Sequence, residues 1–206
     1  MRFVPGGATA ALAVSLLSTS AFAYPKGITG FSGKSTSTCT TCHQPGAPVP
    51  TVEISGPATL APGETGQYTF IIRGGPARVG GAGIAVSDAA ASLTAVTGAG
   101  LMRSNGELIQ TPAKPFTDGE LRFDFALVAP ASAGTLTLFA AGNSANEDGL
   151  NTGDGVANTT LDVTVTAGTD TEEERGGCST AGGAPVWLLS LLAGGALLRR
   201  SRTASR

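Results

Sequence analysis

Strict alternation of apolar and polar residues over short segments most limits what this chain can fold into. Four segments place apolar side chains at every second position, which puts them on one face of a strand. They span residues 67–72, 120–127, 135–140 and 160–165, and weaker candidates span 51–54, 82–87, 92–97 and 107–111. Turn residues such as Asn105-Gly106, Asp118-Gly119 and Pro130 separate them. The pattern predicts short strands joined by tight turns.

The part of the chain between Tyr24 and Glu174 has no amphipathic helical pattern of useful length. About seven or eight short antiparallel strands in this length favour an all-β fold, an immunoglobulin-like antiparallel β-sandwich over residues 51–167. The inward-facing rows of the alternating segments should form its core. The predicted core residues are Phe70, Ile72, Phe123, Phe125, Leu136 and Leu138.

The N-terminal end, residues 1–23, has the pattern of a secretory signal peptide, which predicts an N-terminal signal helix. Arg2 supplies a positive charge, residues 8–17 are largely apolar, and Ala21-Phe22-Ala23 is a small-x-small cleavage site. Cleavage after Ala23 would leave Tyr24 as the new N-terminus. The chain is therefore expected to be exported, with residues 24–50 as an N-terminal arm before the sandwich.

The C-terminal end predicts a hydrophobic helix after an acidic linker at residues 168–177. Residues 185–198 form a run of 14 residues without charge, and Arg199, Arg200 and Arg202 follow. A membrane-spanning helix needs about 20 apolar residues, so the run is short. A basic cluster behind it would stay on the cytoplasmic side. A plain single-span anchor is one interpretation of residues 178–206.

The other interpretation comes from Gly177-Cys178, the apolar run and the terminal arginines, because this arrangement resembles the MYXO-CTERM sorting tail of exported myxobacterial proteins. The resemblance implies that a membrane-embedded sorting protease cuts near Cys178. It also implies that Cys178 carries lipid on the mature protein. The expected location is the cell surface, anchored to the outer membrane through the lipid or the tail.

The charge of the mature part argues against nucleic acid as a partner. Five of the 13 basic residues lie in the two ends, which leaves 8 against all 15 acidic residues. A net charge near −7 does not suit binding to phosphate backbones. The sequence does not specify which extracellular ligand the sandwich would bind, because loops carry recognition and sandwich folds are shared by unrelated functions.

The arm carries a C-x-x-C-H motif formed by Cys39, Cys42 and His43, the only histidine in the chain. At this spacing two thiols can form thioether bonds to a haem while the histidine ligates the iron. The motif predicts a c-type haem, with a five-coordinate iron or with Met102 or water as a weak distal ligand. The flanking segments are rich in Ser, Thr, Pro and Gly and offer no apolar wall. A Cys39–Cys42 disulfide, usual for exported thiols, and a metal site are the alternatives.

A second group of polar residues lies between Asn143 and Asp154. Six Asn, Asp and Glu side chains occur within 12 residues there, and their oxygen ligands suit Ca²⁺. The candidate ligands are Asn143, Asn146, Asp148 and Asp154. The alternative is a polar loop whose Asn and Asp side chains cap their own turns.

Several segments together resemble the bacterial reelin-like domains, also called choice-of-anchor domains. They are Tyr24–Gly30, the C-x-x-C-H motif, Ala140–Gly149 and Thr152–Asp154. The resemblance implies a surface-exposed sandwich of reelin type without enzymatic activity. Related domains have a Trp-x-x-Pro turn where Leu127–Pro130 lacks the Trp. The residues themselves also provide no base for a Ser/His/Asp or Cys/His hydrolase arrangement, because the lone histidine belongs to the cysteine motif.

Overall fold

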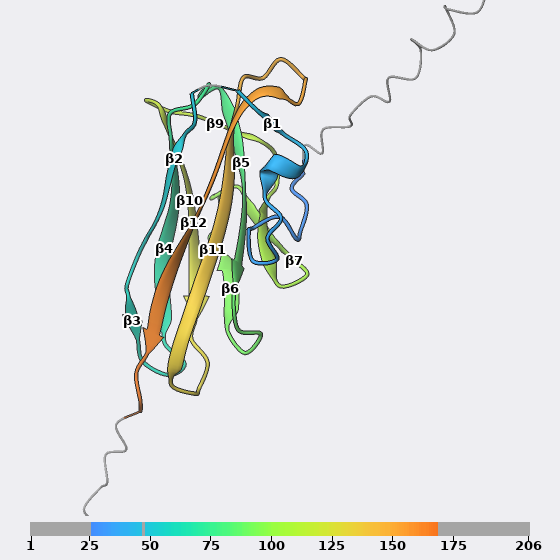
Figure 1. Cartoon of the computed structure of the whole chain (residues 1–206). Coiled ribbons are helices and arrows are strands. Elements are labelled where there is room, and N and C mark those ends of the chain that lie inside the picture. The colour runs from blue at the N-terminus through green and yellow to red at the C-terminus, as the bar shows by residue number, and fades with distance from the viewer. Residues whose placement is uncertain (1–25, 47, 169–206) are drawn as a thin grey trace, which may run out of the picture. The chain divides into compact units, whose positions relative to one another are not determined.

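The computed structural model describes residues 26–46 and 48–168, and these residues form an immunoglobulin-like antiparallel β-sandwich (Figure 1). Their only helical element is one 3₁₀ turn, η1 (Cys39–Thr41). The predicted signal helix and C-terminal helix lie outside the described residues, as do Ala23, Gly177 and Cys178. Within the described ranges, no helix has the length and apolar character needed to cross a membrane.

The larger of two sheets has eight strands. Its main path runs β1 (Gln44–Pro45), β12 (Thr152–Val165), β11 (Gly134–Ala145), β5 (Val79–Val86), β8 (Glu107–Gln110) and β7 (Leu101–Ser104). Two short strands join it at the side, β3 (Thr59–Leu60) on β12 and β9 (Lys114–Pro115) on β5. The pairs β1–β12 and β3–β12 are parallel and the others are antiparallel.

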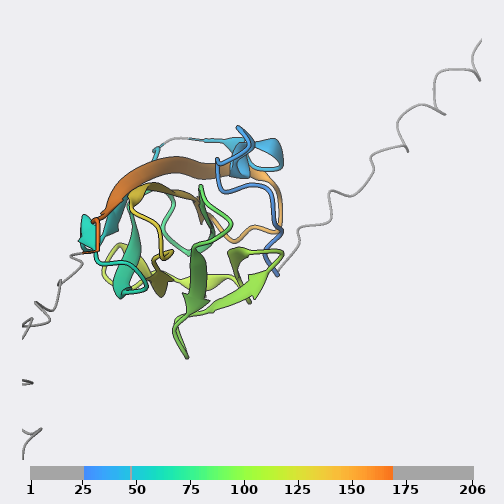
Figure 2. The same cartoon turned by 90° about the horizontal axis from the view of Figure 1, so that it is seen from below.

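The smaller sheet has four strands in the order β2 (Thr51–Ser55), β4 (Thr65–Arg73), β10 (Glu120–Val128) and β6 (Ser92–Ala95). Strands β4 and β10 pair over nine residues, with Phe123 opposite Phe70 and Phe125 opposite Tyr68. The Tyr68 and Phe125 rings stack with centroids 5.6 Å apart. Seen end-on, the two sheets curve around a common interior (Figure 2).

The interior contains the residues that the alternating segments predict. Phe70, Ile72, Phe123, Phe125 and Leu138 are fully buried, and Leu136 is 2% exposed. The predicted core is therefore confirmed. Burying each such side chain contributes about 1.5–3 kcal/mol, so these rows are the main stabilising feature of the sandwich.

The turns between strands follow the sequence signals. Asn105 and Gly106 both have positive φ, 48° and 83°, and connect β7 to β8 with Ser104 paired to Glu107. A two-residue hairpin loop with positive φ at both positions matches the twist of the flanking strands, and Asn-Gly adopts it most readily. Asp118 and Gly119, just before β10, also both have positive φ, 51° and 75°.

Two expectations about the strands were wrong. The described residues contain twelve strands instead of seven or eight, because short edge segments such as β1, β3 and β9 also pair. The last two long strands extend farther than predicted, since β11 reaches Ala145 and β12 begins at Thr152. Asn143 and Asp154 therefore lie in paired strands, and only the residues between the strands form a loop.

Candidate functional site

The N-terminal arm, residues 26–46, lies against the outer face of the larger sheet (Figures 1 and 2). The Gly27 amide donates to the Gln110 carbonyl at 2.9 Å, and the Lys34 ammonium donates to the Val86 carbonyl at 2.7 Å. Ser32, in the middle of this contact, is 2% exposed. The arm is thus a packed layer of the fold and not a free terminus.

Two glycines of β5 lie close to neighbouring segments, Gly83 under the arm and Gly81 beside Gln110 of β8. Ile84 of this strand points into the core, so its neighbour Gly83 faces outward. A Cβ added at Gly83 would lie 3.6 Å from the Ser32 amide nitrogen. At Gly81 an added Cβ would lie 2.6 Å from the Gln110 side chain, closer than real Cβ contacts allow. A Cβ alone would fit at Gly83, because 3.6 Å is an ordinary van der Waals distance, so only a larger side chain there would press on the arm; Gly81 makes room for Gln110 of β8.

The C-x-x-C-H motif folds as one short turn, η1. The Cys42 and His43 amides both donate to the Cys39 carbonyl, at 3.2 and 2.9 Å. The side-chain amide of Asn151, from the loop before β12, donates to the Cys42 carbonyl at 3.0 Å. The backbone of the motif is therefore fixed both by its own turn and by a loop more than 100 residues away in sequence.

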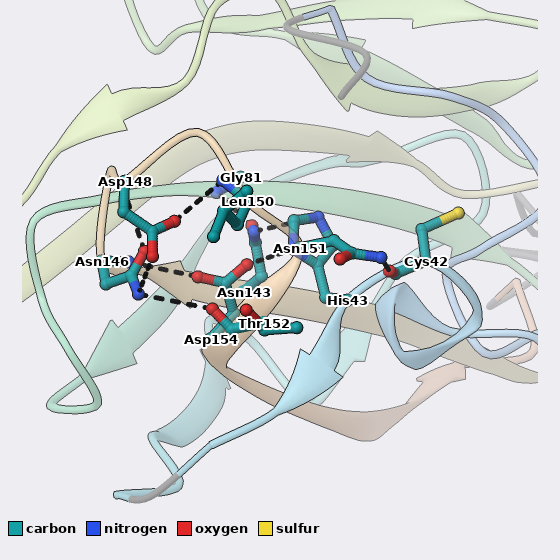
Figure 3. A network of polar contacts seen from close by, with 10 residues as sticks. All are labelled: Cys42, His43, Gly81, Asn143, Asn146, Asp148, Leu150, Asn151, Thr152 and Asp154. Carbon is teal, nitrogen blue, oxygen red and sulfur yellow. Dashed lines mark hydrogen bonds and ion pairs between the residues drawn. The ribbon is translucent and has the colours of Figure 1, made fainter. Parts of the chain in front are cut away.

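His43 is joined to the sheet by a short contact with Asp154 (Figure 3). Its Nδ1 lies 2.5 Å from Asp154 Oδ2, and the two side chains are 30% and 1% exposed. Because a carboxylate only accepts, Nδ1 carries the proton. The other carboxylate oxygen accepts from the Asn146 amide at 3.1 Å. The buried charge of Asp154 is thereby satisfied from two sides.

The second ring nitrogen of His43 also faces the sheet. Its Nε2 lies 3.4 Å from the Asn143 amide nitrogen, which would donate a long, weak hydrogen bond to it. The Asn143 oxygen accepts from the Gly81 amide at 2.7 Å, which leaves the nitrogen on the side of the ring. Both ring nitrogens of His43 are therefore directed at side chains of the larger sheet.

The two thiols of the motif differ in their surroundings. Both are free in the structure, with Cys42 exposed and Cys39 only partly accessible. Burial raises the pKa of the Cys39 thiol to about 11, and the neighbouring Cys42 adds to the rise. The Cys42 side chain points away from the His43 ring (Figure 3). The two cysteines share one turn but present sulfurs of unequal accessibility.

The four candidate Ca²⁺ ligands use their oxygens in hydrogen bonds within the protein. Asn146 and Asp148 bond reciprocally, since the Asp148 amide donates to the Asn146 oxygen at 3.1 Å and the Asn146 amide group donates to Asp148 at 3.0 Å. Asp148 also accepts from the Leu150 amide at 2.8 Å. These are side-chain caps of a turn. Within the described residues, no cluster of three His, Cys, Asp or Glu side chains could hold a metal ion.

The structure brings together Cys42, His43, Asn143, Asn146 and Asp154, which the sequence treats as two separate groups. Sequence reasoning missed the contributions of Asn151 and Gly81 to this network. The strand candidate at residues 82–87 left out Gly80 and Gly81, which lie in β5. Repeated glycine inside a strand is a signal of close backbone approach and could have indicated the packed arm.

No protein-family model and no curated protein matches the chain. Among solved structures it is similar to the PKD domain of an M14-like peptidase from Thermoplasmatales archaeon SCGC AB-540-F20, at 17% identity and a TM-score of 0.35. That match covers 58% of this chain and 94% of the other.

A second similar structure is the CARDB domain of the PF1109 protein from Pyrococcus furiosus, described as a complex with di-metal ions. The identity is 19% and the TM-score 0.32, over 57% of this chain and 90% of the other. At these values neither likeness assigns a function.

Proposed function

We propose that this chain is an exported, surface-anchored sandwich of reelin-like type that serves as a binding or structural module without enzymatic activity. In this proposal the arm is a fixed cover of the larger sheet, and Cys39 and Cys42 pair as a disulfide in the oxidising exterior. The observation that carries it is the position of His43. Its Nδ1 faces the buried Asp154 at 2.5 Å and its Nε2 faces Asn143 at 3.4 Å, so the ring acts as a link between arm and sheet.

The proposal includes surface anchoring through the C-terminal tail. The supporting features are the short apolar run of residues 185–198 and the arginines behind it. A sorting protease would cut near Gly177-Cys178, and Cys178 would carry lipid. The proposal includes no Ca²⁺ ion, because the loop before β12 has side-chain caps of its own.

A c-type haem at Cys39, Cys42 and His43 is the second candidate. One observation favours it: metal-ligating histidines commonly donate their other ring N–H to a carboxylate, as His43 does to Asp154. The haem would supply ligand binding or electron transfer. To accept iron, Nε2 would have to lose its contact with Asn143, and the Cys42 side chain, which points away from the ring, would have to turn (Figure 3).

Visible absorption and intact mass separate the two candidates. The protein should be purified from an exporting host that attaches haem, together with a Cys39→Ser/Cys42→Ser variant. The proposal expects a colourless protein whose mass is lower by two hydrogens than that of the reduced chain, a difference that the variant lacks. A haem absorption band and a haem mass, both lost in the variant, would overturn it in favour of the second candidate.

A further inference from the structure

The cysteine pair has an asymmetry that a purely structural disulfide does not need. Cys42 is exposed, whereas Cys39 is only partly accessible. Their backbones are one turn apart, because the Cys42 amide donates to the Cys39 carbonyl at 3.2 Å. Cys42 is therefore accessible to solvent, whereas access to Cys39, on the same turn, is restricted. Exposed disulfides are the labile ones, whereas structural disulfides resist reduction.

The arm is held to the sheet by groups other than the two sulfurs. Asn151 holds the Cys42 carbonyl at 3.0 Å, and Asp154 holds the His43 ring. Beyond the motif, the Gln44 amide donates to the Asn151 carbonyl at 2.6 Å and the Gly46 amide donates to the Asp154 carbonyl at 2.7 Å. Forming or breaking a Cys39–Cys42 bond would therefore leave the arm attached.

We propose that Cys39 and Cys42 form a thiol–disulfide exchange couple, in which Cys42 reacts with disulfides of other molecules and Cys39 resolves the intermediate. The partner class is a protein or low-mass disulfide in one direction and the matching thiol in the other. This inference rests on the proposed function, because both sulfurs must be free of haem.

The exchange balances in two steps. Cys42 loses its proton to solvent, and its thiolate attacks one sulfur of the partner's disulfide. The partner's S–S bond breaks: the attacked sulfur stays in a mixed disulfide with Cys42, and the other sulfur leaves as a thiolate and takes up a proton. Cys39 then loses its proton to solvent, and its thiolate attacks the Cys42 sulfur; the mixed disulfide breaks, and the remaining partner sulfur leaves as a thiolate that takes up a proton. Two cysteine thiols are oxidised to one disulfide, and one partner disulfide is reduced to two thiols.

The test uses the full exported protein, reduced with dithiothreitol and then mixed with oxidised glutathione, with peptide mass mapping to assign each modified cysteine. Wild type should return to the Cys39–Cys42 disulfide and retain no glutathione. The Cys39→Ser variant should stop at a stable glutathione adduct on Cys42. The matched Cys42→Ser variant should form its adduct on Cys39 at least about tenfold more slowly, because access to that sulfur is restricted.

Two results would overturn the exchange couple: equal adduct rates in the two single variants, or a wild-type disulfide that dithiothreitol reduces only in denaturant. A circular dichroism spectrum with unchanged β content confirms that each variant is folded. Haem absorbance is recorded before reduction. Its presence would end the proposed function itself, whereas a colourless but unreactive protein would refute only the exchange couple.

Discussion

Replacing His43 with alanine should weaken the attachment of the arm to the larger sheet. In the native protein the buried Asp154 carboxylate has two partners in the structure, His43 Nδ1 at 2.5 Å and the Asn146 amide at 3.1 Å. The substitution removes the imidazole N–H that donates to Asp154. The Asp154 carboxylate, which is 1% exposed, then keeps one hydrogen-bond donor, the backbone amide of Asn146. Breaking a buried pair by removing one partner costs about 3–5 kcal/mol.

The cost here should fall below that range. His43 is 30% exposed, so water can enter the space that the ring vacates and solvate Oδ2. We therefore expect about 2–3 kcal/mol for His43→Ala, starting from the values for fully buried pairs. If the arm opens only when the whole sandwich unfolds, this corresponds to a Tm lower by roughly 6–12 °C.

Hydrogen exchange distinguishes opening of the arm alone from unfolding of the whole sandwich. The Gln44 and Gly46 amides donate across the arm–sheet contact. If the arm opens by itself, His43→Ala should speed their exchange by about 30- to 150-fold, the factor that corresponds to 2–3 kcal/mol. Amides of β4 and β10 should then keep their protection, and the Tm should change little.

Two controls accompany this experiment. Arg122→Ala removes an ion pair with Glu120 whose arginine side chain is 51% exposed, and it should change neither the Tm nor exchange in the arm, since exposed pairs contribute little. His43→Gln keeps an N–H donor and should recover part of the loss. If His43→Ala changes neither the Tm nor the exchange of Gln44 and Gly46, the Asp154 contact does not hold the arm.

Two further predictions concern the core and the buried thiol. Gly142→Ala should destabilise the protein by about 1–3 kcal/mol in urea unfolding, because the added Cβ would lie 2.4 Å from Ile72 Cδ1. Gly168→Ala is the control, since the space around Gly168 is open. Equal urea midpoints for the two variants would contradict the packing argument. The raised pKa of Cys39, about 11, includes a smaller contribution from Cys42, so in the Cys42→Ser variant alkylation of folded Cys39 should rise with pH between 9.0 and about 11, whereas in urea it should rise through about 9.0. Since burial favours the protonated thiol, its contribution to the free energy of unfolding of this variant should be fully present below pH 9 and should be lost as pH rises toward 11. If the alkylation profiles of the folded and the urea-unfolded protein coincide, burial does not raise the pKa of Cys39.

The core strands could be predicted from sequence because one face of each strand is buried and the other is exposed to solvent. In β10 the apolar residues Leu121, Phe123, Phe125 and Leu127 are all buried, while Arg122 and Asp124 between them are exposed. A shift of one residue would turn the whole row to solvent, so the alternation defines both the strand and its inner face. The short strands β1, β3 and β9 have two residues each, too few to show a period.

The site could be predicted only in parts, because its parts meet through pairing between distant segments. His43 and Asp154 are 111 positions apart, and their meeting depends on the parallel pairing of β1 with β12, where Gln44 lies opposite Thr152 and Pro45 opposite Asp154. Nothing in the local sequence around either residue records that pairing. The sequence suggested two separate ligand groups, the cysteine–histidine motif and the oxygen-rich segment between Asn143 and Asp154. In the structure the histidine of the motif is hydrogen-bonded to a carboxylate of that segment, Asp154.

This connection changes how the C-x-x-C-H motif should be interpreted. A histidine that serves as an iron ligand through Nε2 needs that nitrogen free, whereas a histidine that fastens the arm needs only its Nδ1 contact with Asp154. Asn143 is the residue that distinguishes these roles, since its amide nitrogen faces Nε2 while its oxygen is held by the Gly81 amide. The glycine-rich strand β5 contributes to this arrangement, because the Gly81 amide orients the Asn143 side chain that faces the histidine.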